Sequence, residues 1–144
     1  MKVAMTEQEQ ANLSCPMVLL RHALPDGSFH YDWLLATDSE GVRPLRTFRV
    51  ADFLPKAKEG SRISAEAIAE HRPAYLTYEG PVSQGRGHVL RAAEGQYERV
   101  SQTGKSVQLL LFWTGESHIQ RCRLTPVDEE LQKWWVDFLE IRVK

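Results

Sequence analysis

The sequence predicts a mainly β protein: a closed or nearly closed antiparallel β-barrel with short helices and a C-terminal amphipathic helix. The first observation is a series of about seven or eight short apolar segments separated by turn signals, at a spacing typical of barrels and sandwiches. The second is a change of period after residue 124, where apolar residues begin to recur at helical spacing. Together they predict strands first and one closing helix.

The composition indicates a single globular domain. The chain has 144 residues, of which 42% are hydrophobic and 26% charged, and its net charge of −1 argues against a strongly basic nucleic-acid binder. No apolar stretch approaches the ~20 residues of a membrane span, and no signal peptide is evident, so we expect a cytoplasmic monomer that does not bind membranes. Cys15 and Cys122 are far apart and indicate two reduced thiols.

The domain divides into three segments. Residues 1–16 are expected to form an N-terminal arm, to which no function is assigned, and residues 17–124 the barrel. Residues 125–144 are expected to form a helix packed on the barrel, with Thr125 as its N-cap and Pro126 at its first position. The helix would carry one apolar face, made of Leu131, Trp134, Trp135, Phe138 and Leu139.

A hairpin is predicted over residues 17–35, with its turn at 25–27, where Pro, Asp and Gly follow one another. The side-chain period of two in a strand places His30 and Asp32 on one face, and His22 at the end of the first strand can close on them. Two neutral imidazoles and a carboxylate suit a divalent transition metal with positions left open for water or substrate. The alternative is a surface histidine paired with a neighbouring carboxylate.

The middle of the chain predicts further strands and one short helix. We expect a strand over 43–50, a surface loop over 52–62, a helix from Ser64 that Pro73 stops, and a strand over 74–78. Two more hairpins are expected to pair 88–92 with 96–100, and 106–113 with 119–124. In the strand over 43–50, Leu45 points away from Phe48 and Val50, which share a face with Arg46. The pattern therefore does not decide which face of this strand is buried.

Four segments of the chain together carry a family likeness. They are His22 with Phe29-His30-Tyr31-Asp32-Trp33, His71-Arg72-Pro73-Ala74-Tyr75, Tyr78-Glu79-Gly80 with the Gly-rich run to Gly87-His88-Val89, and the closing strands around Gly115. In order and in most spacings they resemble the 3′-phosphoesterase domain of bacterial DNA ligase D, the end-joining ligase, and its stand-alone relatives. The resemblance covers residues 17–124. It implies a closed β-barrel and a manganese-dependent hydrolase that removes 3′-phosphates and 3′-terminal ribonucleotides during DNA repair.

The resemblance also implies a metal site. His22, His30 and Asp32 would be the ligands of a divalent cofactor, manganese first, with zinc or another transition metal as the alternative. A metal ion clamps phosphate oxygens and lowers the pKa of bound water, which suits phosphoester hydrolysis.

The remaining implied site residues are His71 and Tyr75, as catalytic groups, and Arg62, as a substrate-binding group displaced by one position from a family arginine. The implied partners are nucleic-acid 3′ ends and the ligase or polymerase components of DNA repair. Without the resemblance, His71 would be interpreted as a helix-end imidazole and Tyr75 as an ordinary barrel-mouth aromatic.

The chain departs from the family pattern where cations hold phosphate. Leu34 stands where the family has an arginine, and Asp52 where it has a lysine. Ala69 replaces an acid, although Glu70 is adjacent, and the gap between the first two histidines is two residues longer. These changes should weaken substrate binding more than metal binding, because the metal ligands themselves remain.

Two alternatives therefore stay open beside the phosphoesterase. One is a catalytically weak or inactive barrel that keeps a metal site and serves as a binding module, which Leu34 and Asp52 motivate. The other is a non-haem iron oxygenase, because His30-x-Asp32 with a distant histidine is also a 2-His-1-carboxylate pattern.

Overall fold

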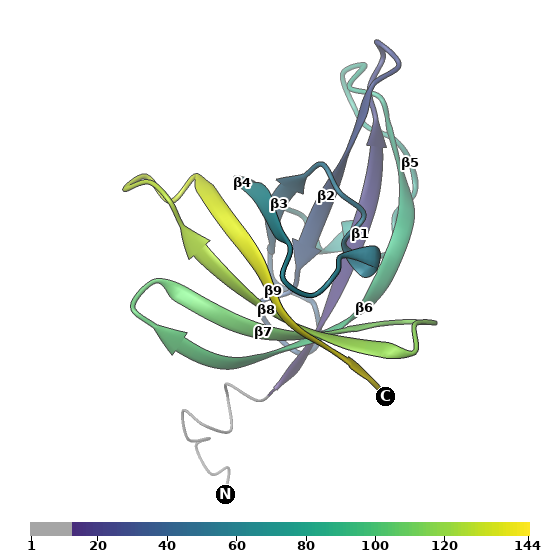
Figure 1. Cartoon of the computed structure of the whole chain (residues 1–144). Coiled ribbons are helices and arrows are strands. Elements are labelled where there is room, and N and C mark those ends of the chain that lie inside the picture. The colour runs from purple at the N-terminus through teal and green to yellow at the C-terminus, as the bar shows by residue number, and fades with distance from the viewer. Residues whose placement is uncertain (1–12) are drawn as a thin grey trace, which may run out of the picture.

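The fold is a single antiparallel sheet whose strands close into a ring (Figure 1). The computed structural model describes residues 13–144. Nine strands and two short 3₁₀ helices follow one another in the order β1 Ser14–Ala23, β2 Phe29–Leu35, β3 Leu45–Val50, η1 Leu54–Lys56, β4 Arg62–His71, η2 Pro73–Leu76, β5 Gly80–Pro81, β6 His88–Thr103, β7 Ser106–Trp113, β8 His118–Pro126 and β9 Lys133–Val143.

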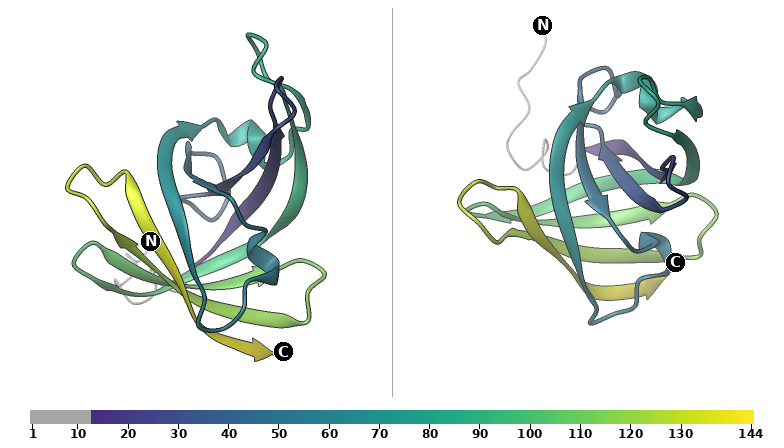
Figure 2. Two further views of the ribbon diagram at one scale, coloured as in Figure 1. Left: turned by 45° about the horizontal axis from the view of Figure 1, so that its top comes forward. Right: turned by 90° about the horizontal axis from the view of Figure 1, so that it is seen from above.

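The strand order is β1-β2-β3-β4-β9-β8-β7-β6-β5, and a further pairing of β1 with β6 closes a ring of eight strands. The two-residue strand β5 lies outside this ring, paired with the start of β6. Figure 2 shows the ring from two more directions. The predicted mainly β, antiparallel fold is confirmed. No helix in residues 13–144 is long and apolar enough to cross a membrane.

Two apolar cores lie on opposite faces of the β1–β2 hairpin. The larger core fills the inside of the ring, and its members come from nearly every strand, among them Leu19, Trp33 and Phe48. The smaller core includes Leu20 and Leu34, the sequence neighbours of the first two, and is covered by η2 and the segment around β5. Because successive side chains of a strand alternate between faces, the smaller core must lie on the outside of the ring.

This double burial resolves the ambiguity in β3. Leu45 is fully buried in the outer core, whereas Phe48 and Val50 are buried in the inner core. Arg46 shares the inner face and lies over the ring of Phe48, with 4.9 Å between the guanidinium carbon and the ring centroid. Each face of β3 therefore carries buried apolar residues beside one exposed arginine, Arg46 or Arg49, which explains the conflicting pattern.

The predicted first and last hairpins are confirmed, by β1–β2 and β7–β8. The predicted hairpin over 88–100 is wrong, because β6 runs unbroken from His88 to Thr103. Gly95 marks a close approach there and no turn: a Cβ on it would lie 2.1 Å from the carbonyl oxygen of Phe112 on β7.

The predicted helix from Ser64 is also wrong, and β4 takes its place. Ile63 and Ala65 point into the ring while Ser64 and Glu66 point out, so the segment has period two. The predicted strand over 74–78 is wrong too, since η2, which begins at Pro73, occupies most of it.

The predicted C-terminal helix over 125–144 is wrong. Strand β8 ends only at Pro126, and Lys133–Val143 form β9. Trp134, Val136 and Phe138 are buried inside the ring at period two. Pairing with both β4 and β8 satisfies the backbone of β9 and overrides the helical spacing of its apolar residues. The expected arm, residues 1–16, lies mostly outside the described residues, and 14–16 already belong to β1.

Candidate metal centre

The residues of the candidate site lie on the outer face of the β1–β2 hairpin, beyond the smaller core. His22 and His30 are directly opposite each other in the strand pairing, and Asp32 follows two residues later on the same face of β2. The hairpin turn that brings them together begins at Leu24, whose carbonyl accepts a hydrogen bond from the Gly27 N–H. The sequence therefore folds locally into a site because a tight turn joins two alternating strands.

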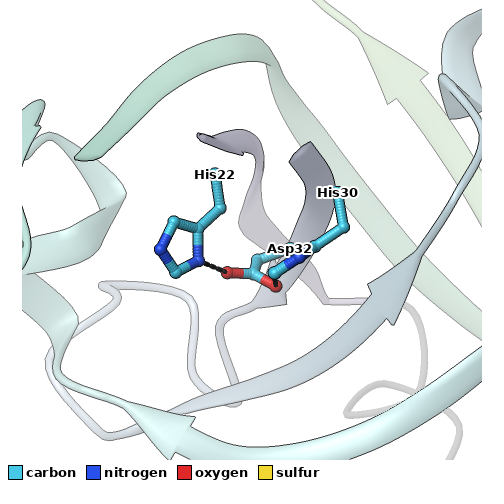
Figure 3. A group of neighbouring side chains, drawn as sticks. All are labelled: His22, His30 and Asp32. Carbon is cyan, nitrogen blue, oxygen red and sulfur yellow. Dashed lines mark ion pairs between the residues drawn. The ribbon is translucent and has the colours of Figure 1, made fainter. Parts of the chain in front are cut away.

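The three side chains converge on the Asp32 carboxylate, as Figure 3 shows. His22 Nδ1 lies 3.4 Å from Asp32 Oδ2, and His30 Nε2 lies 3.1 Å from Asp32 Oδ1. Asp32 is buried, with a side-chain exposure of 3%. His71 approaches the same carboxylate from the end of β4, with 4.0 Å between its Nε2 and Asp32 Oδ2. Four sequence-predicted residues therefore meet at one point.

The tautomer of His22 follows from its outer contact. His22 Nε2 lies 2.7 Å from the backbone carbonyl oxygen of Arg86, in the loop between β5 and β6. A carbonyl can only accept, so Nε2 carries the hydrogen and donates it. In the neutral ring, Nδ1 then presents its lone pair to Asp32. A ligand histidine held in this way by a carbonyl is a common arrangement at metal sites.

The tautomer of His71 follows from its contacts in the same way. Its Nδ1 lies 3.1 Å from the carbonyl oxygen of Ala69 and 3.2 Å from the hydroxyl of Thr47. The Thr47 hydroxyl donates its own hydrogen to the carbonyl of Leu45, so its oxygen accepts from His71. Nδ1 therefore carries the hydrogen, and in the neutral ring the lone pair of His71 Nε2 faces Asp32.

His30 and Asp32 contribute the buried polar atoms of the site that lack a well-aligned hydrogen bond. His30 Nε2 and Asp32 Oδ1 are both buried, lie 3.1 Å from each other and have no well-aligned hydrogen bond to any described residue. Desolvation by burial lowers the pKa of His30, although the charge of Asp32 opposes this shift. The lowered pKa favours the neutral ring, which carries a single N–H and so can give Asp32 at most one hydrogen.

His22 and His71 therefore direct lone pairs at a buried carboxylate, and among the three imidazoles only His30 can offer it a hydrogen. A divalent cation satisfies such a set, because it takes nitrogen and carboxylate oxygen as ligands at ~2.0 to 2.2 Å. Neighbouring ligands around one ion are then roughly 3.0 to 3.5 Å apart, by the geometry of these bond lengths. The distances from Asp32 to His22 and His30, 3.4 and 3.1 Å, fall in this range. The residues present fit a metal ion.

The cluster opens into a cavity of about 1050 Å³. Three cationic side chains line it that sequence reasoning did not assign to the site: Arg49, Arg72 and Arg86. Arg49 on β3 is the direct cross-strand neighbour of Asp32. The sequence signal that could have identified Arg49 is the alternation of Thr47, Phe48 and Arg49. It places Thr47 and Arg49 on the face opposite the inner core.

Tyr75 lines the cavity beside His71, with 5.2 Å between the ring centroids, and also packs on the outer core. Arg62 is not brought to this site. It lies at the start of β4, where its Nε donates to Asp137 Oδ1 at 2.7 Å, and it does not line the cavity. Leu34 is fully buried in the outer core, and Asp52 is exposed.

No protein-family model matches the chain, and no curated protein shows significant similarity to it.

Proposed function

We propose that this chain is a metal-dependent phosphoesterase acting on the 3′ ends of DNA or RNA, by removal of a 3′-phosphate or a 3′-ribonucleotide. The observation that carries the proposal is the meeting of three imidazoles and a buried carboxylate, two of whose buried polar atoms lack a well-aligned hydrogen bond, in a cavity that three arginines line. Metal and guanidinium groups together are the recurring means of holding a transferring phosphoryl group. The proposal also rests on the resemblance to the ligase D phosphoesterase domain, which implies a closed barrel and so agrees with a ring of strands.

The arginines of the cavity answer the main objection from the sequence. Leu34 replaces a phosphate-holding arginine of the resembled family and is buried away from solvent. Arg49 stands beside Asp32 on the neighbouring strand instead, and its charge reaches the site strongly enough to contribute to the lowered pKa of His30. A guanidinium at this position can bind phosphate oxygens in a bidentate manner.

Each side chain has a role in this proposal. His22, His30 and Asp32 would hold the ion, most readily manganese, which supplies charge to bind phosphate oxygens and to activate water. His71 Nε2, which faces Asp32 Oδ2 at 4.0 Å, would exchange a proton with a substrate oxygen, since its Nδ1–H is held by Ala69 and Thr47. Tyr75, next to His71, would donate its hydroxyl hydrogen to a phosphate oxygen.

The experiment measures release of inorganic phosphate from a 3′-phosphorylated primer-template with manganese. We expect turnover by the unaltered chain and its loss in Asp32→Ala. Asp52→Ala is the matched control, because Asp52 is exposed and does not line the cavity. Equal rates for the unaltered chain and Asp32→Ala would contradict the proposal. The substrate also implies a place beside DNA, in the cytoplasm, with DNA-repair ligase or polymerase components as partners.

A binding module that keeps the metal is the second candidate, and the buried Leu34 favours it. Calorimetric titration with manganese separates the two functions. Stoichiometric metal binding that Asp32→Ala abolishes, without phosphate release from any 3′-phosphorylated end, would assign the module.

A further inference from the structure

A second cavity opens at the end of the ring interior, away from the candidate metal centre. Its volume is about 600 Å³, within the range of small-molecule sites. Four side chains of its floor also belong to the inner core, namely Leu35, Phe48, Leu109 and Leu124. The two cavities share no lining residue, so the second one is independent of the chemistry proposed above.

Three cations surround this apolar floor: Arg46, Arg99 and Lys105. None of them has a carboxylate within ion-pair distance among residues 13–144. Asp38 is the acid at the cavity, and its oxygens accept the backbone N–H groups of Val42 and Arg43 at 3.2 and 3.1 Å. The carboxylate of Asp38 is therefore engaged in its own loop.

Arg46 is the most informative of the three cations. Its guanidinium lies over two aromatic rings, 4.9 Å from the centroid of Phe48 and 4.8 Å from that of Trp134. It makes no hydrogen bond to any other described residue, and the residue as a whole is exposed. Its surroundings desolvate it enough to lower its pKa. The five donors of an arginine in such a place are available to an anion.

We propose that this cavity binds a small amphipathic carboxylate. The apolar body would lie on the leucine and phenylalanine floor, and the carboxylate would accept hydrogen bonds from Arg46, with Arg99 and Lys105 adding positive charge. Apolar contact and a charge-assisted hydrogen bond then act on the two ends of one ligand. Neither a cationic amphiphile nor a bare anion satisfies both ends.

Isothermal titration calorimetry of the full chain with dodecanoate, below its micellar concentration, tests the proposal. We expect one site, with acetate and dodecyltrimethylammonium each binding at least about tenfold more weakly, since each lacks one of the two interactions. Arg46→Gln should weaken dodecanoate binding about tenfold. Lys105→Gln, in the exposed β6–β7 turn, should weaken it as well and removes no packing contact of the core.

Arg142→Gln is the matched control, because Arg142 pairs with Glu140 and does not line the cavity. It should leave dodecanoate binding unchanged, and so should Asp32→Ala in the metal centre. Equal binding of the cationic amphiphile or of acetate would overturn the proposal, as would equal weakening by Arg142→Gln. A chain that self-associates and is only dissociated by dodecanoate would assign the cavity to a second copy and overturn it too.

Discussion

The inner and outer faces of the β1–β2 hairpin pack against very different surroundings. On the inner face, Leu19 and Trp33 join a core to which strands all around the ring contribute. On the outer face, Leu20 and Leu34 belong to a much smaller core, and the same face continues into the histidine and aspartate cluster. The inner face is packed from every side, whereas the outer face is covered only by the segment around η2 and β5.

One hairpin supplies both stability and a site in this fold. Alternation along each strand separates the two tasks, because neighbouring residues point to opposite faces. A polar cluster inside the ring would displace apolar packing, but outside the ring the short covering segment leaves a cavity of about 1050 Å³ beside it. The following substitutions break one face and leave the other intact.

Phe48→Ala should have the largest effect, and it acts on the inner face alone. Phe48 is fully buried and packs against Trp33 and Trp134. Its loss should lower the free energy of unfolding by ~3 to 5 kcal/mol, as for other large core aromatics. Urea denaturation measures this. Arg49→Gln, at the next and exposed position, should change stability by less than about 0.5 kcal/mol. A loss below ~1 kcal/mol for Phe48→Ala would show that the ring interior is not the main core.

Asp32→Asn should act on the outer face alone. The substitution keeps the shape of the side chain but removes the charge on which the imidazoles converge, so manganese affinity should fall about 100-fold or more, beyond the loss typical of outer-shell changes. Without metal, the free energy of unfolding should not decrease, because a buried carboxylate with an unpaired oxygen is itself unfavourable. Calorimetry and urea denaturation give the two quantities.

Asp52→Asn is the control for that experiment, since Asp52 is exposed and outside the cavity. It should change neither quantity. If Asp32→Asn destabilised the metal-free protein strongly while manganese affinity stayed the same, the cluster would be a structural ion-pair network.

The difference between the faces also explains what the sequence could predict. The site hairpin was predictable, because Pro25 to Gly27 set a local turn and the period of two places His22, His30 and Asp32 on one face. His71 and the arginines come to the site through long-range pairing. Arg49, for example, is adjacent to Asp32 only because β2 pairs with β3 in a particular register. Sequence spacing carries no direct record of such pairing.

The strands β4 and β9 were mistaken for helices for one shared reason. Each pairs with the strand before it and also with the other, which is far away in the sequence. Alanines in β4 and apolar residues at helical spacing in β9 favour a helix locally. Pairing on both edges overrides this local preference and makes the two segments strands.

Gly87→Ala tests how the covering segment supports the outer site. Gly87 has φ +89°, and a Cβ on it would lie 1.9 Å from the carbonyl oxygen of Ala23. The loop would have to move, and with it the Arg86 carbonyl that fixes His22. We expect manganese affinity to fall about tenfold, the lower end for loss of an orienting partner. Figure 1 shows this loop beside the tip of the β1–β2 hairpin.

Gly85→Ala is the control that separates the effect of the Cβ collision in Gly87→Ala from the effect of the left-handed backbone conformation. Gly85 also has a positive φ, +65°, but a Cβ there meets nothing within 4 Å. Both variants carry the conformational cost of a left-handed residue, and only Gly87→Ala carries the collision. Similar manganese affinities for the two variants would show that the Arg86 carbonyl does not orient His22.

The smallest effect distinguishes two cysteines: Cys15, which lines the second cavity, and Cys122, which lies in the inner core. Burial, and secondarily the charge of Asp38, raises the pKa of Cys15 above the usual thiol value. Burial raises the pKa of Cys122 as well, and its side chain has no exposure. Since the thiolate is the nucleophile, iodoacetamide at pH 8 should modify Cys15 a few-fold more slowly than in urea, and Cys122 only after unfolding.

The same shifts set the sign of a pH effect. A thiol with a raised pKa in the folded chain stays protonated there while the unfolded chain ionises, so its contribution to stability is present below the unfolded pKa and is lost as the pH rises further. The Cys15 labelling rate should therefore keep rising above pH 9, where the rate of the unfolded chain levels off. Mass spectrometry across this range follows both cysteines at once. Labelling of Cys122 at the rate of Cys15 would mean that the ring interior is open along its length, and the contrast between a packed inner face and an accessible outer face would then be lost.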